Sequence, residues 1–221
     1  MGAGVLAAAA LITASLIASR AEESSPPAKL IGADETNALL DGIPQSGIAL
    51  GRADAPVTLA DYSDLQCPYC AAWTQTALPE LVQDYVRTGR VRIEFRGLAF
   101  VGPESDLGLR AALAAGRQGR LWHVVDLLYR NQGAENSGWL TEHTLHRVGA
   151  SVPELDTPRM LEERGDVGDQ MEAARTAATR AGITGTPSFE VGPTGGRLHR
   201  VAVSSLEAEA LRPALDAALA K

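Results

Sequence analysis

Residues 57–70 read VTLADYSDLQCPYC, and this stretch decides the fold. Its first six residues, 57–62, are typical of a short strand, because apolar and β-branched residues dominate them. After Cys67, large apolar side chains recur at helical spacing from Trp73 to Tyr85, which predicts a helix. A Cys-x-x-Cys pair therefore lies where a strand gives way to a helix.

Cys67 stands at the start of the expected helix, and this position favours its thiolate. A helix N-terminus has a partial positive charge and free backbone N–H groups that stabilise an anion. Pro68 fits the first helical position, where no backbone N–H is needed. We therefore expect the helix to lower the pKa of Cys67 and to make this residue the nucleophile.

Cys70 follows one helical turn later, within reach of a Cys67–Cys70 disulfide. The pair is expected to cycle between dithiol and disulfide, with the less exposed Cys70 resolving mixed disulfides. A static disulfide or two inert thiols remain alternatives for an isolated Cys-x-x-Cys. A zinc site completed by His143 and His146 is a further alternative, but these histidines lie far from zinc-finger spacing and on the expected solvent side of a helix, so we expect no metal.

The folded part is expected to begin near Pro44 and to alternate strands and helices at first. Residues 48–50 are an expected strand, and so are residues 91–95, where apolar and charged residues alternate. The helix between them is expected to run to Arg87, with a kink at Pro79. The first half of the chain thus has the order β-β-α-β.

The second half changes character. From residue 104 to 182 the spacing of apolar residues predicts about four or five helices. Sheet signals return at 188–191 and 198–201, which flank a glycine-rich turn and predict a hairpin. A last helix is expected from Ser205 to Ala220. Ser204 or Ser205 would cap it, and its buried side would hold Leu206, Leu211, Leu215 and Leu219.

An uncharged apolar segment from Gly2 to Ser19 begins the sequence. Residues 1–20 are predicted to be a signal peptide or a membrane anchor, and Arg20 favours the uncleaved anchor because it is an unusual neighbour for a cleavage site. The lack of Lys or Arg before this segment suggests a start codon farther upstream. Residues 21–43 are the expected linker, since their first part is polar and rich in proline.

Export follows from this interpretation. An anchored protein would face the outside of the cytoplasm, and a cleaved one would be secreted or periplasmic.

The net charge of −7 and the pI near 5.1 argue against nucleic acid as a partner. With two neighbouring cysteines, the chain cannot form a disulfide framework that joins distant segments, so the pair serves chemistry or metal binding.

Two segments carry a resemblance to a known family. Residues 61–70, DYSDLQCPYC, resemble the active-site segment of DsbA-type thiol oxidoreductases of the thioredoxin superfamily. Residues 182–189, GITGTPSF, resemble the segment where that superfamily has a cis-proline beside its cysteine pair. The resemblance implies an α/β thioredoxin-like fold with an inserted helical domain. The expected parts are a first thioredoxin part at 44–103, a helical insertion at 104–177 and a second thioredoxin part at 178–221.

The resemblance also implies roles for individual residues. Pro187 would be the cis-proline, and the Thr186 backbone would form strand-like hydrogen bonds with a client peptide. Asp61 would be the buried acid that accepts and returns the proton of Cys70. An ordinary solvated aspartate at a strand end remains an alternative for Asp61.

Pro68 and Tyr69 form the central dipeptide of the motif. The best-known strong oxidase of the family has a histidine where this chain has Tyr69, and tyrosine cannot supply a positive charge to the Cys67 thiolate. We therefore expect a weaker oxidant than that enzyme.

The expected function is disulfide donation to secreted or cell-envelope proteins by an enzyme whose only redox group is its own disulfide, without a further cofactor. Cysteine-containing client proteins would be its substrates, a membrane redox partner would reoxidise it, and we expect it to be a monomer. An extracytoplasmic reductase or isomerase would share every motif. A redox-silent peptide-binding chaperone on the same fold is an alternative from another class.

Overall fold

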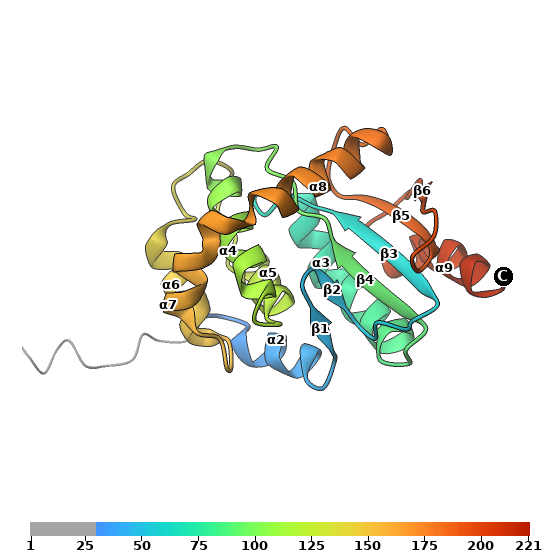
Figure 1. Ribbon diagram of the computed structural model, residues 1–221, viewed down its shortest axis with the longest axis horizontal. Coiled ribbons are helices and arrows are strands. Elements are labelled where there is room, and N and C mark those ends of the chain that lie inside the picture. The colour runs from blue at the N-terminus through green and yellow to red at the C-terminus, as the bar shows by residue number, and fades with distance from the viewer. Residues whose placement is uncertain (1–29) are drawn as a thin grey trace, which may run out of the picture.

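The computed structural model describes residues 30–221. The predicted signal or anchor segment at 1–20 and the first part of the predicted linker lie outside the described residues. A six-stranded sheet in the order β1-β2-β4-β3-β5-β6 forms the centre of the molecule (Figure 1). The strands are β1 (Gln45–Ser46), β2 (Ala49–Leu50), β3 (Val57–Tyr62), β4 (Val91–Phe95), β5 (Ser188–Pro193) and β6 (His199–Val201).

Strands β3 and β4 are parallel, and all other neighbouring strands of the sheet are antiparallel. The parallel pair requires a crossover, which the helix after the cysteine motif provides. All six residues of β3 are buried, because both faces of this central strand are covered. The expected hairpin at 188–201 is present as β5 and β6.

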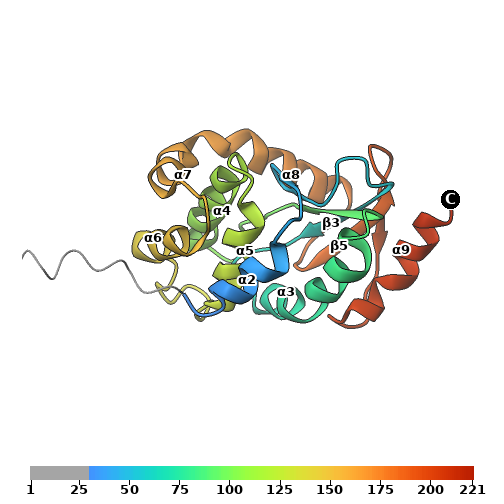
Figure 2. The same ribbon diagram turned by 90° about the horizontal axis from the view of Figure 1, so that it is seen from below.

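Helix α3 (Pro68–Leu81) covers one face of the sheet, and α8 (Gly168–Arg180) covers the opposite face (Figure 2). On the α3 face the indole of Trp73 packs against Phe189 of β5, with ring centroids 5.0 Å apart. On the α8 face Ala178 and Ile183 join a small apolar cluster with Ala60 and Tyr62 of β3.

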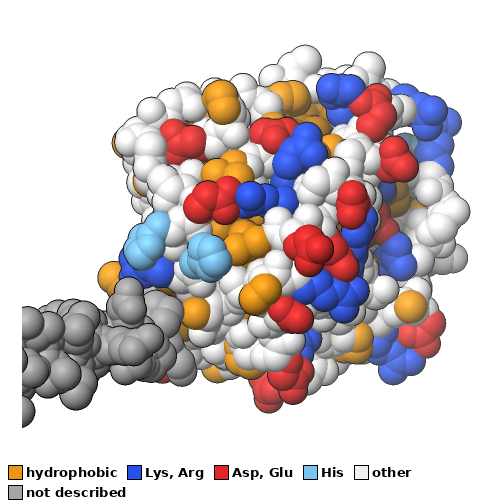
Figure 3. Space-filling view, turned by 60° about the vertical axis from the view of Figure 1, so that its left-hand side comes forward, with side chains coloured by type: hydrophobic (Ala, Val, Ile, Leu, Met, Phe, Trp, Pro, Cys, Tyr) orange, Lys and Arg blue, Asp and Glu red, His pale blue; other side chains and the backbone are white. Residues whose placement is uncertain are grey.

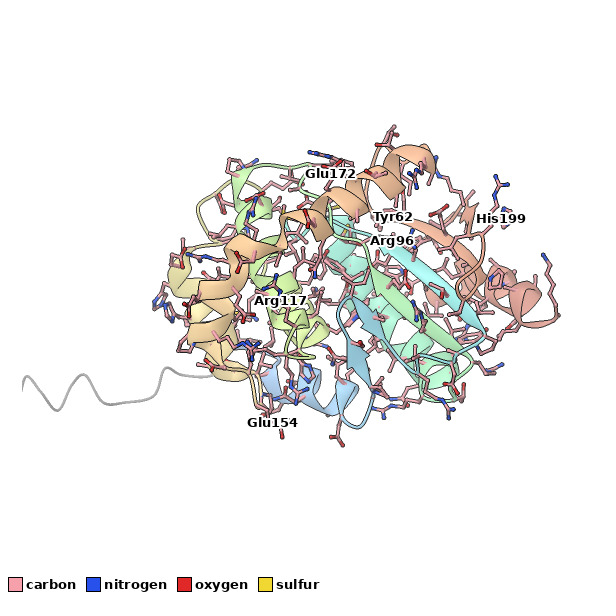
Figure 4. All side chains as sticks on the ribbon, viewed as in Figure 1. Tyr62, Arg96, Arg117, Glu154, Glu172 and His199 are labelled. Carbon is pink, nitrogen blue, oxygen red and sulfur yellow. The ribbon has the colours of Figure 1, made fainter. Side chains whose placement is uncertain are left out.

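The α8 face also holds a polar cluster that joins three strands. Arg96 donates to the Tyr62 hydroxyl at 2.6 Å, and the same hydroxyl donates to Glu190 of β5 at 2.6 Å. Arg96 also donates to Glu94 of β4 at 3.0 Å. Figure 4 shows Tyr62 and Arg96 close together beneath α8. Because these groups are largely buried, their mutual hydrogen bonds offset much of their desolvation.

The helical block lies beside the sheet and ends in α8, which returns across it (Figure 1). Its other members are α4 (Pro103–Gly116), α5 (Leu121–Arg130), α6 (Glu142–Ser151), α7 (Thr157–Glu163) and a 3₁₀ turn, η3 (Arg164–Val167). The amphipathic helix α5 is buried at nearly every position, because it packs against both α3 and α4. Within residues 30–221, none of the helices is long and apolar enough to cross a bilayer.

The prediction of a linker at 21–43 is wrong for its second half, which contains a helix. Residues Ala33–Leu40 form helix α2, which packs against α5 and buries Leu30 and Leu40 in the main core. Thr36 donates its hydroxyl hydrogen to the buried carboxylate of Asp126 on α5. The polar, proline-rich composition ends before residue 30, and this tertiary contact stabilises a helix too short to persist alone.

The start of the last helix also differs from expectation. The last helix, α9 (Arg212–Leu219), starts seven residues later than predicted and is preceded by a 3₁₀ turn at Ala208–Ala210. Pro213 lies in its first turn, where a missing N–H costs nothing, so neither Ser204 nor Ser205 caps it. The helix after Cys67 ends where it was predicted to end, because α3 continues as a π-helical turn, η2 (Val82–Val86), with Arg87 as its C-cap residue.

Candidate active site

Cys67 is the N-cap residue of α3, as the strand-to-helix transition predicts. Its backbone is extended, with φ −72° and ψ 120°, and Pro68 occupies the first turn of the helix. A short loop, residues 63–66, joins β3 to this position, and the Cys67 N–H donates to the Asp64 carbonyl oxygen at 3.0 Å. The sulfur therefore faces the free N–H groups of the helix start.

The pKa of Cys67 is lowered from 9.0 to about 6. The largest cause is a hydrogen bond from the Cys70 side chain, which stabilises the Cys67 thiolate. Hydrogen bonds from Thr186 and from the backbone of Tyr69 and Cys70 also lower this pKa. Burial raises it, but by less than the hydrogen bonds together lower it. Cys67 is thus ionised at neutral pH although only 6% of its surface is exposed.

Cys70 shows the opposite behaviour. It is 0% exposed, and burial raises its pKa well above the ordinary thiol value. The negative charges of Cys67 and Asp61 raise this pKa further. Both cysteines are free in this structure, which therefore has the reduced dithiol form. One thiol of the pair is a nucleophile in contact with solvent, and the other is a protonated, enclosed thiol.

Pro187 and Thr186 lie directly beside the dithiol, although they are far from it in sequence. In its thiol form Cys67 donates through Sγ to the Thr186 carbonyl oxygen at 3.4 Å. The Thr186–Pro187 peptide bond is cis, and strand β5 begins at the next residue, Ser188. The structure brings the two segments on which the family resemblance depends into one site.

Asp61 lies on β3 and is 1% exposed, so it is not a solvated aspartate at a strand end. Burial raises its pKa from 3.8 to about 7, and the charge of Cys67 contributes in the same direction. The Ser63 hydroxyl donates to Asp61 Oδ1 and partly opposes this shift. A carboxyl group that changes protonation near neutrality lies under the dithiol.

Sequence reasoning did not single out the residues that hold the loop before Cys67. Asp64 accepts from the backbone N–H groups of Gln66, Phe100 and Val101 and from the Ser105 hydroxyl, at 2.6 to 2.9 Å. Tyr129 of α5 donates its hydroxyl hydrogen to the Asp64 carbonyl oxygen at 3.1 Å. The only sequence signal for this network is the run of polar residues between a buried strand and the cysteines.

The zinc alternative has no support in the geometry. His143 and His146 lie on the exposed side of α6, as expected. Across residues 30–221 there is no group of three or more His, Cys, Asp or Glu side chains that could hold a metal ion. Tyr69, the third residue of the cysteine motif, is 66% exposed and lies at the rim of the site.

Comparison with known proteins agrees with this geometry. The family model described as thioredoxin matches residues 44–216. A probable disulfide bond formation protein D of Bacillus cereus is 31% identical over 148 residues, which cover 65% of this chain and 68% of that protein.

Solved structures give the same result for the fold. The oxidised BdbD of Bacillus subtilis superposes with a TM-score of 0.67 at 19% identity, over 80% of this chain and 99% of that one. A thioredoxin-like oxidoreductase of Silicibacter pomeroyi superposes with a TM-score of 0.62 at 28% identity, over 84% of this chain and 98% of that one. This chain therefore belongs to the DsbA-like thiol-disulfide oxidoreductases of the thioredoxin superfamily.

Proposed function

We propose that this enzyme donates its Cys67–Cys70 disulfide to cysteine-containing proteins outside the cytoplasm. The observation that carries the proposal is the lowered pKa of Cys67, to about 6. A stabilised thiolate favours the reduced form of the pair, so the oxidised form is a stronger disulfide donor.

Donation proceeds in two exchanges. A client thiolate attacks Cys67 Sγ, the bond between Cys67 and Cys70 breaks, and Cys70 leaves as a thiolate that takes up a proton. A second client thiolate then attacks the client sulfur of the mixed disulfide, and Cys67 leaves as a thiolate. Two electrons pass from the client to the enzyme, and the client gains one disulfide.

Asp61 is the proton donor for the departing Cys70 in this scheme, and the proton acceptor in the reverse direction. Its pKa of about 7 suits both tasks, because such a group can give and regain a proton at neutral pH. The Thr186 backbone, next to Cys67 Sγ, is the proposed contact for an extended client segment. The exposed ring of Tyr69 adds an apolar contact beside it.

The proposed location outside the cytoplasm is supported by the apolar segment at residues 2–19 and by the need for an oxidising compartment. A membrane redox partner would accept the two electrons and restore the disulfide, and the chain would act as a monomer without another cofactor. Acidic and basic side chains are interspersed on the face drawn in Figure 3. That face has no extended basic field of the kind that nucleic-acid binders use.

A reductase or isomerase is the second candidate, because these enzymes use the same dithiol geometry. The reduction potential of Cys67–Cys70, titrated against glutathione, separates the directions of electron flow. We expect a value on the oxidising side of the glutathione couple. A value as reducing as that of thioredoxin would contradict disulfide donation and assign the enzyme to reduction.

Trapping tests whether the dithiol is used at all. In Cys70→Ser the mixed disulfide between Cys67 and a client cannot be resolved, so covalent complexes with a reduced cysteine-containing peptide should accumulate. The matched variant Cys67→Ser should form none and should have no turnover. Full activity of Cys67→Ser in the cell would instead support the redox-silent chaperone.

A further inference from the structure

A small group of buried polar side chains lies beneath the cysteine pair. Within it, the two carboxylates, Asp61 and Asp64, differ in how many hydrogen bonds they accept. Asp61, Ser63 and Tyr129 are all buried, as is Cys70 above them. Ser63 donates its hydroxyl hydrogen to Asp61 Oδ1. Within residues 30–221, this is the one hydrogen bond that the Asp61 carboxylate accepts.

The ionisable groups that interact with Asp61 do not stabilise its negative charge. Cys67 and Cys70 on α3 and Tyr129 on α5 each interact with Asp61 electrostatically, and all three are acids. Asp64, the other carboxylate near Tyr129, is committed to four donors of its own. The hydroxyl of Ser63 is therefore the principal group that stabilises a negative charge on Asp61.

Tyr129 cannot replace Ser63 in this task. Burial and the charges of Cys70, Asp61 and Asp64 raise the pKa of Tyr129 well above its ordinary value, so it remains a neutral phenol. Its hydroxyl hydrogen already donates to the Asp64 carbonyl oxygen at 3.1 Å.

We propose that Ser63 is a positioning residue for proton transfer, whose hydroxyl holds the Asp61 carboxylate and keeps it available as the acceptor of the Cys70 proton. When Cys70 resolves a mixed disulfide, which reverses the first exchange of donation, its proton passes to the Asp61 carboxylate, and the Cys70 thiolate displaces the bound thiol from Cys67 as a thiolate. During disulfide donation the same proton returns. Ser63 keeps its own proton throughout. The inference rests on the proton exchange in the proposed function and holds for either direction of electron flow.

The test measures how fast Cys70 displaces glutathione from the mixed disulfide that glutathione forms with Cys67. In the wild-type protein, release of glutathione should rise with pH, with a midpoint at or somewhat below pH 7, because the mixed disulfide lacks the Cys67 charge that contributes to the Asp61 pKa of about 7 in the dithiol. In Ser63→Ala the midpoint should move upward by about one pH unit, and release at pH 7 should slow several-fold to about tenfold. Ser63→Gly also lacks the hydroxyl and should show the same shift.

Asp61→Asn should abolish the midpoint near pH 7, and adding Ser63→Ala to it should change nothing more, because the two residues act through one group. The matched control is Ser105→Ala. It removes a buried hydroxyl that donates to Asp64 at 2.6 Å, in the same network, and should leave the midpoint where it is.

A midpoint unchanged in both Ser63→Ala and Ser63→Gly would overturn the role of Ser63. An equal shift in Ser105→Ala would do so too, since it would mark a general effect of loosening the loop. Neither result would touch the proposed function. Failure of the wild-type protein to release glutathione from Cys67 at any pH would instead overturn the dithiol mechanism itself.

Discussion

Cys67 and Cys70 differ in acidity although they are the same residue type on one helical turn. Cys67 lies at the helix start with several donors directed at its sulfur, while Cys70 is enclosed beside Asp61. The Cys67 thiolate accepts a hydrogen bond from Cys70, and its negative charge makes ionisation of Cys70 less favourable. At the scale of single residues, position relative to N–H groups and to buried charge sets the chemistry.

We expect alkylation of reduced Cys67 by iodoacetamide to follow a titration curve with a midpoint near pH 6. Reactivity should be high above this pH and fall below it, because the thiolate is the reacting form. In Cys70→Ala the midpoint should rise by about 1 to 2 pH units, since a hydrogen bond to a charged group contributes roughly 1.5–3 kcal/mol. Mass spectrometry of quenched samples measures the rate. An unchanged midpoint in Cys70→Ala would show that the helix start alone lowers the pKa.

At the scale of elements, α2 shows how a short helix depends on one tertiary contact. Its eight residues are too few for stability in isolation, and its buried face meets α5 through apolar contacts and the Thr36–Asp126 hydrogen bond. Asp126 also accepts from Arg130 at 2.6 Å, so the carboxylate is shared between two helices.

Thr36→Val removes this hydrogen bond with little change in side-chain shape. We expect the free energy of unfolding to fall by about 1–3 kcal/mol, because the buried Asp126 loses a partner. Urea denaturation followed by circular dichroism measures the loss. The control is Thr179→Val on α8, an exposed threonine that bonds only to a carbonyl of its own helix, and its effect should be within about 0.5 kcal/mol. Equal effects of the two variants would mean that α2 contributes no specific contact.

At the scale of the whole molecule, the buried acid that serves the reaction weakens the fold. The pKa of Asp61 is about 7 in the folded protein and near 3.8 when solvated, so the unfolded chain releases this proton more readily. The contribution of Asp61 to the free energy of unfolding is therefore most favourable below about pH 4. It decreases as the pH rises from about 4 to about 7, and it is constant above that. An active site that depends on an acid in an apolar setting therefore has a stability cost.

Asp61→Asn should remove this pH dependence. The variant and the wild-type protein should differ little at pH 4, and at pH 8 the variant should be more stable by up to about 4 kcal/mol, from roughly three pKa units. Guanidinium denaturation of the reduced proteins at both pH values measures the difference. Asp169→Asn, at an exposed position of α8, is the matched control, and its effect on stability at pH 8 should lie within about 0.5 kcal/mol. A variant less stable than wild type at pH 8 would contradict the assignment of Asp61 as a destabilising buried acid.

The sequence by itself determined the class of fold, the cysteine pair and most of the elements. Local information suffices for these features, because the composition of residues 57–62, the alternation at 91–95 and the place of Cys67 before Pro68 depend on neighbours in the chain. Two motifs far apart, at 61–70 and 182–189, were also enough to indicate the family. The alternation at 188–201 likewise predicted a hairpin that the structure contains.

Only the tertiary structure decided how these pieces act on one another. The burial of Asp61 and the approach of Thr186 to Cys67 Sγ depend on segments that sequence spacing does not relate. The existence of α2 was likewise set by packing, which overrode the composition of the segment around it. The physical reason is that desolvation and hydrogen bonding between distant residues set pKa values and marginal helices, and neither is encoded in a local pattern.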